Sequence, residues 1–259
     1  FFGKCGTPSF GWKRGGVMAT LLLRLAAPLQ SWGSGSKFEV RKTNREPTKS
    51  GVVGLLAAAL GLRRDNTREL SQLNRLRFAV RVDQEGTLLM DYHTANNPTP
   101  DEVKQARREN KKVGAPYVTK RYYLADAIFL VGLESEDEGL LQRLSWALEH
   151  PVYPLFLGRR SCPPTLPLCL GVRPEPLLDV VRSEPSQVPA WKHNQLHTRI
   201  VMDAEPDDPD AVPCRDLAIS FSPIHRQFGY RPVREISAQL PVKTRNEDET
   251  THDPFAELR

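Results

Sequence analysis

The sequence predicts an α+β protein whose larger part is a ferredoxin-like domain, followed by a smaller, β-rich C-terminal region. The strand and helix signals between residues 20 and 172 approximate the order β-α-β-β-α-β, which is the pattern of that fold. After residue 173 the pattern weakens, but two runs at 216–221 and 234–242 still favour strands. A polar segment at 95–116 has no apolar face, so we expect it to project from the core.

The start of the chain and the cysteines set the limits of the fold. Residues 1–17 precede Met18 and lack the apolar core of a signal peptide, so we interpret them as an extension outside the fold. No apolar run approaches the length of about 18 residues that a membrane helix needs. The four cysteines form no CxxC pair, which favours a reduced, cytoplasmic protein. The predicted units are therefore 1–17, 18–172 and 173–259.

The first half of the domain is predicted from apolar patterning. Residues 20–29, "TLLLRLAAPL", form an apolar run that reads as a buried strand. A helix is predicted at 51–60, with Gly61 placed where a helix ends. Residues 75–83 alternate as in a strand, and the turn "QEG" favours a hairpin with 87–94.

The second half of the domain repeats the pattern of strand, helix and strand. Strand character resumes at 117–133, and 140–150 has the spacing of an amphipathic helix. A loop, "PLFLGRRSCPP" at 154–164, then leads to the last strand at 165–172.

Charge indicates a polyanionic partner. The net charge is +5, and the basic residues gather at 36–64 and 101–123, whereas the acidic ones gather at 134–138 and 203–210. Such segregation says more about a binding surface than the net charge does.

The stretch "REPTKSGVV" predicts an anion site at a helix start. Thr48 or Ser50 is placed to cap the helix, and Arg45 and Lys49 bring positive charge to an end that normally prefers an acid. We expect free backbone N–H groups there to face a phosphate. The alternative is a solvated turn whose basic residues bind nothing.

Two further features indicate contact with single-stranded nucleic acid. Gly158 allows close backbone approach, and two arginines follow it in the turn. The basic segment at 95–116 fits phosphates, although it also fits a disordered loop. Trp32 is a candidate for stacking on bases, but aromatic residues in such runs are more often core. The predicted RNA-binding residues are Arg24, Trp32, Arg41, Arg45, Thr48, Lys49, Ser50, Arg107, Arg108, Lys111, Lys112, Arg159, Arg160 and Ser161.

The sequence predicts no catalytic residue, no metal site and no cofactor. His193 and His197 have helical spacing but lack the glutamate of a zinc protease motif. Tyr92 and His93 are neighbours, so in a strand their side chains face opposite ways and do not share one site. Lys192 lies beside His193 in the weakly patterned third, where the sequence does not place the pair near the predicted RNA-binding residues.

Four stretches together resemble the Cas-five family of CRISPR proteins, and within it the type I-E branch. They are "LLLRLAAPLQSWG", "REPTKSGVVGLLAAALGLRRD", "YYLADAIFLVGL" and "PLFLGRRSCPP". The resemblance covers residues 18–172 and is weaker beyond them. It implies an RRM-related, RAMP-type ferredoxin-like domain with a projecting β-hairpin thumb, for which 95–116 is the candidate.

The resemblance also implies a function and partners. Such proteins hold the 5′ handle of the CRISPR RNA (crRNA) in Cascade, the type I-E surveillance complex. They contact its last backbone subunit and the large subunit that reads the PAM, and through the complex they serve recognition of target DNA.

Two rival classes stay open. Relatives of type I-C cut the precursor RNA with a Tyr, Lys and His set, so a metal-independent endoribonuclease is one alternative. The candidate thumb at 95–116 contains no His and no Tyr, which argues against it. A protein-only scaffold whose basic patches meet acidic neighbours is the other.

Overall fold

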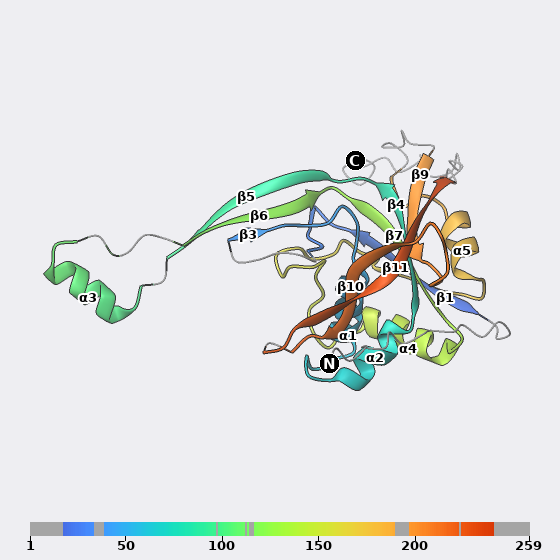
Figure 1. Ribbon diagram of the computed structural model, residues 1–259, viewed down its shortest axis with the longest axis horizontal. Helices are drawn as coiled ribbons and strands as arrows, with labels where there is room; N and C mark the ends of the chain where they lie inside the picture. The colour runs from blue at the N-terminus through green and yellow to red at the C-terminus, as the bar shows by residue number, and fades with distance from the viewer. Residues whose placement is uncertain are drawn as a thin grey trace, which may run out of the picture.

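A seven-stranded antiparallel sheet forms the body of the protein, seen in a computed structural model (Figure 1). The structure describes residues 18–33, 39–96, 98–111, 113, 117–189, 197–222 and 224–240. The strand order of the sheet is β10-β11-β9-β4-β7-β1-β8. Its strands are β1 (Ala19–Ala26), β4 (Arg77–Gln84), β7 (Ile128–Ser135), β8 (Cys169–Arg173), β9 (His197–Asp203), β10 (Val212–Ser220) and β11 (Gln227–Gln239).

Helices cover both faces of this sheet. On β1, Leu21, Leu23 and Leu25 belong to one core cluster with residues of three helices, whereas Leu22 packs with a fourth helix on the other face. β1 is therefore buried on both sides, which explains its nearly continuous apolar sequence. The first three helices are α1 (Lys49–Ala59), α2 (Thr67–Asn74) and α4 (Glu138–Glu149), and the fourth is α5 (Leu177–Ser183).

The strands after residue 173 extend the same sheet. β9 pairs with β4, and β11 pairs with both β9 and β10. The predicted strands at 216–221 and 234–242 correspond to β10 and β11, whereas β9 was not predicted. The C-terminal strands therefore share a sheet with the rest of the body.

A long hairpin projects from the body and carries a helix at its far end (Figure 1). We call this unit, β5 (Thr87–Ala95), α3 (Pro100–Arg108) and β6 (Tyr117–Ala125), the thumb. Near the body, β6 also pairs with the short strands β2 (Leu29–Gln30) and β3 (Val40–Arg41). No residue of α3 is buried, and Thr99 begins the helix in a reciprocal capping box with Glu102. The described residues of the polar segment 95–116 thus form the outer end of the thumb.

Two predicted strand assignments are corrected. The turn after β4 does not form a hairpin between β4 and β5, because β7 and β9 already occupy both edges of β4. The run 117–133 is divided into β6 and β7, which lie in different sheets. The division falls at Asp126, whose φ of +57° lies in the left-handed region and ends the extended chain. Within the described residues, no helix is long and apolar enough to cross a membrane.

Candidate nucleic-acid interface

The start of α1 is occupied by a carboxylate from the same chain. Thr48 caps the helix, and its Oγ1 accepts a hydrogen bond from the Gly51 N–H at 3.2 Å. The backbone N–H of Lys49 donates to Asp216 Oδ2 on β10 at 2.8 Å. Two of the N–H groups at this helix start, those of Lys49 and Gly51, therefore have acceptors within the chain and do not face an external phosphate. The anion that makes this basic helix start favourable is Asp216, which lies 167 residues further along the chain.

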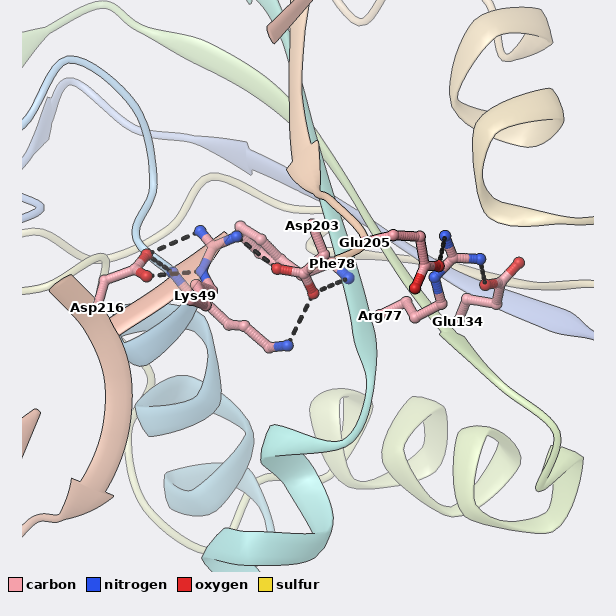
Figure 2. A network of polar contacts seen from close by, with 8 residues as sticks. Lys49, Arg77, Phe78, Glu134, Asp203, Glu205 and Asp216 are labelled. Carbon is pink, nitrogen blue, oxygen red and sulfur yellow. Dashed lines mark hydrogen bonds and ion pairs between the residues drawn. The ribbon is translucent and has the colours of Figure 1, made fainter. Parts of the chain in front are cut away.

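The side chain of Lys49 is also engaged inside the protein (Figure 2). Its Nζ lies 2.8 Å from Asp203 Oδ2, and only 5% of the side chain is exposed. Arg231 joins the two acids, because it contacts Asp216 through Nε and Nη2 and Asp203 through Nη1. Burial, opposed by the charge of Asp203, holds the pKa of Lys49 below its usual value. Lys49 is thus part of an internal ion network and does not face solvent.

Four other residues that the sequence predicted to contact RNA lie elsewhere. Three of them are buried, and the fourth lies on the face of the sheet opposite to α1. Thr48 and Ser50 are buried at the helix start. Trp32 is 2% exposed, its Nε1 donates to Gln30 Oε1 at 3.1 Å, and its ring lies against α1 at Gly51. Stacking of a base on Trp32 is therefore excluded. Arg24 lies between Leu23 and Leu25 on β1, so it shares the face that packs against α5, opposite to α1.

An arginine cluster forms where β3 meets β6. The parallel pairing of these strands places Arg41 beside Arg121, and Arg159 Nη2 donates to the Arg41 carbonyl oxygen at 2.9 Å. The Arg159 guanidinium lies 4.5 Å from the centroid of the Tyr123 ring. Its buried Nη1 has no hydrogen-bond partner among the described residues. We call Arg41, Arg121 and Arg159 the arginine cluster.

The arginine cluster depends on a glycine in the loop that carries Arg159. Gly158 has a φ of +86°, and a Cβ built there would lie 1.7 Å from the Ser31 carbonyl oxygen. Ser31 N–H in turn donates to the Leu157 carbonyl oxygen at 3.1 Å. The close approach expected at Gly158 is therefore made to the backbone of Ser31. It fixes Arg159 next to Arg41, although 118 residues separate them.

Three other predicted residues are exposed in the loops that flank Arg41 and contain Arg159. Arg45 is exposed in the loop after β3, and Arg160 and Ser161 are exposed in the loop after Gly158. Sequence reasoning did not select Arg121 as a contact residue, because its basic charge lies within a strand pattern and only pairing with β3 places it beside Arg41.

A second basic group lies at the tip of the thumb, away from the arginine cluster (Figure 1). Arg107 and Arg108 are exposed in the last turn of α3. Lys111 is exposed as well and pairs with Glu109 at 2.8 Å. Lys112 lies outside the described residues. Apart from Arg24 and Lys49, the predicted basic residues that the structure describes therefore lie in two separate groups, one on the body and one on the thumb.

The candidate acid–base pairs do not form a site. Tyr92 and His93 occupy successive positions on β5 and face Lys120 and Thr119 of β6, so their side chains lie on opposite faces of the thumb. Lys192 and His193 are outside the described residues. Across the part of the chain that the structure describes, no three His, Cys, Asp or Glu side chains are grouped so that they could hold a metal ion.

Comparisons with known proteins agree on one family. The profile of the family described as "CRISPR-associated protein (Cas_Cas5)" matches residues 20–234. The protein "CRISPR system Cascade subunit CasD" of Escherichia coli (strain K12) is 41% identical over 164 residues, which is 58% of this chain and 70% of that protein.

Two solved structures have a similar fold. One, described as "Crystal structure of Cas protein", is 36% identical with a TM-score of 0.66, and the match covers 86% of this chain and 98% of that one. A chain of a "CRISPR RNA-guided surveillance complex" is 30% identical with a TM-score of 0.65, and the match covers 86% and 91% of the two chains.

Proposed function

Because the chain belongs to the Cas5 family of CRISPR-associated proteins, we propose that it is a non-catalytic, RNA-binding subunit of a type I-E Cascade complex. In this role it holds the 5′ repeat-derived handle of the crRNA. The arginine cluster carries the proposal. It brings together Arg41, Arg121 and Arg159, and Arg41 is exposed to solvent. Guanidinium groups bind phosphate oxygens through short, charge-assisted hydrogen bonds, often two at once.

The handle site consists of the arginine cluster with Arg45, Arg160 and Ser161. Their charges bind the backbone of a single strand, which gives affinity but no sequence preference. Bases splayed away from that backbone are then available for direct reading, as is usual for RNA. The buried residues at the start of α1 have a structural role in this proposal. They fix α1 and the loop that precedes it, and they are Thr48, Lys49, Ser50 and Trp32.

The thumb is the proposed contact with neighbouring subunits. Its tip offers Arg107, Arg108 and Lys111 to the RNA. One face of the ribbon carries Leu88, Met90 and Tyr92, with 46%, 50% and 60% of their surfaces exposed. An apolar face of this kind on an outer ribbon fits a protein partner. The partners proposed are the last backbone subunit and the large PAM-reading subunit, through which the chain serves target DNA recognition indirectly.

We propose that the RNA-binding domain has a RAMP-type, ferredoxin-like fold. The inner part of the sheet supports it, because α1 joins β1 to β4, α4 joins β7 to β8, and the strands lie in the order β8-β1-β7-β4. We also propose that the complex acts in the cytoplasm, the compartment in which cysteines stay reduced.

Binding of a handle RNA tests the function. The purified chain should bind a short handle RNA more tightly than an unrelated strand of equal length, and its log affinity should fall linearly with log salt. Arg41→Ala should flatten that slope by about 0.7, the loss of one phosphate contact on a single strand. Arg143→Ala, which removes an exposed arginine from α4 on the body, is the matched control. No salt-dependent binding would favour a protein-only scaffold instead.

Incubation with repeat RNA tests the absence of catalysis. RNA cleavage without metal needs a base near the 2′-hydroxyl and an acid or a cation at the leaving oxygen. Tyr92 and His93 lie on opposite faces of the thumb and do not meet this requirement together. The protein in EDTA should therefore leave the RNA intact for hours. Specific cleavage that is abolished by His93→Ala or His193→Ala would establish the endoribonuclease alternative.

A further inference from the structure

One arginine of β9 joins three segments that the proposed function requires to act together. Arg199 Nη2 lies 2.9 Å from Glu46 Oε2, in the loop that carries Arg45. Its Nε lies 3.2 Å from Glu85 Oε1, in the turn that leads into β5 of the thumb. Its Nη1 lies 3.3 Å from Glu235 Oε2 on β11. Each nitrogen of one guanidinium therefore contacts a different segment of the chain.

The position of Arg199 follows from the sheet. On β9, Ile200 and Met202 pack toward α5, so Arg199 and Asp203 share the opposite face, the one that α1 covers. Asp203 holds Lys49 on that face, and Arg199 holds Glu46. The short segment from Glu46 to Lys49 is thus attached to β9 by two ion pairs of opposite polarity.

The same guanidinium fixes the root of the thumb. Glu85 lies two residues before the first residue of β5, in the turn at the base of the hairpin. The ion pair between Glu85 and Arg199 therefore lies at the base of the thumb, where a small rotation of the hairpin produces a large displacement of α3 at its outer end (Figure 1). The Arg199 side chain is 23% exposed, so solvent screens the three contacts only in part.

We propose that Arg199 is a positioning residue that sets the angle between the thumb and the RNA-binding loop without touching RNA itself. This inference rests on the proposed function, because it assigns to the C-terminal strands the task of aligning the two basic groups on one RNA. Arginine is required because its planar fork presents several fixed donors, whereas the single ammonium of lysine does not span three carboxylates.

The test compares Arg199→Lys and Arg199→Met with Arg234→Met in the full chain. Arg234 is the matched control, because within the described residues its one ion pair is with Asp208, at 3.2 Å, and it is paired across the sheet with Met202. Both Arg199 variants should bind handle RNA about fivefold more weakly, the factor that corresponds to about 1 kcal/mol. The salt slope should stay that of the unaltered chain, because no phosphate contact is lost. Arg234→Met should bind as the unaltered chain does.

Hydrogen exchange gives a second readout that is independent of RNA. Arg199→Met should speed amide exchange at 44–47 and 85–89 together and leave β1 and β7 protected, whereas Glu85→Gln should affect 85–89 alone. Wild-type RNA affinity in both Arg199 variants would overturn the inference. So would a salt slope that falls by about 0.7, because that change indicates a direct phosphate contact. Unchanged amide exchange at both 44–47 and 85–89 would overturn it as well. If the unaltered chain binds no RNA, the proposed function fails, and hydrogen exchange still decides whether Arg199 couples the loop to the thumb.

Discussion

Replacing Lys49 or Arg45 by Met should separate folding from RNA binding. These two basic residues are close in sequence but differ in position, because Lys49 is 4% exposed, whereas Arg45 is exposed and belongs to the proposed handle site. Lys49→Met removes the ammonium 2.8 Å from Asp203 Oδ2. Among the described residues, Asp203 then keeps Arg231 and the Phe78 N–H, the latter at 3.0 Å.

The expected cost follows from the burial of that pair. Removing one partner of a buried ion pair lowers the free energy of unfolding by about 3–5 kcal/mol. Because Asp203 retains two donors, we expect about 3 kcal/mol for Lys49→Met at the lower end of that range. For a protein of this size, that loss lowers Tm by about 6–12 °C. Arg45→Met removes an exposed charge and should leave Tm within about 2 °C of the unaltered chain, because surface substitutions cost little.

The RNA-binding assay should give the opposite ranking of the two variants. Arg45→Met should flatten the slope of log affinity against log salt by about 0.7, whereas Lys49→Met should leave the slope unaltered at a temperature where it is folded. Circular dichroism melting and filter binding at several salt concentrations measure the two effects on the same preparations. An unchanged Tm together with a flatter salt slope for Lys49→Met would refute the internal ion network and restore Lys49 as a phosphate contact.

Three further changes have defined outcomes. Gly158→Ala should weaken handle binding and cost about 1–3 kcal/mol of stability by chemical denaturation, because its Cβ would overlap the Ser31 carbonyl oxygen; wild-type behaviour would contradict this geometry. Deleting 98–112 and joining the ends with Gly-Ser should leave Tm nearly unaltered, because α3 buries no residue. The same deletion should impair assembly with the backbone subunit. Unfolding of the shortened chain would instead show that the segment stabilises the body. Burial, followed by the charge of Asp216, raises the pKa of the Cys214 thiol from 9.0 to about 11. The buried neutral thiol of Cys214 therefore contributes stability that is present below pH 9 and is lost as the pH rises toward 11. Alkylation of Cys214, followed on its peptide, should show a midpoint near pH 11 in the native protein and near pH 9 in urea.

Local patterning was enough to locate many of the elements. The apolar runs of β1 and β4, the spacing of α1 and α4, and the polar outer end of the thumb all follow from the sequence. The short helix α3 was missed because it lacks an apolar face, although its capping box, Thr99 with Glu102, was readable. The hairpin predicted for β4 and β5 failed because pairing depends on which edges of β4 are free, and β9, more than a hundred residues later, occupies one of them.

The sequence by itself determined where basic residues gather along the chain and which family it resembles, because charge, spacing and motif are properties of the chain. Only the tertiary structure decided which charges are available. Lys49 and Arg45 look alike in sequence, yet Lys49 is neutralised by Asp203, which lies 154 residues away, whereas Arg45 stays exposed. The physical reason is that a charge acts on whatever lies within a few ångströms of it. Folding, and not sequence distance, brings Asp203 to Lys49 and Arg159 to Arg41.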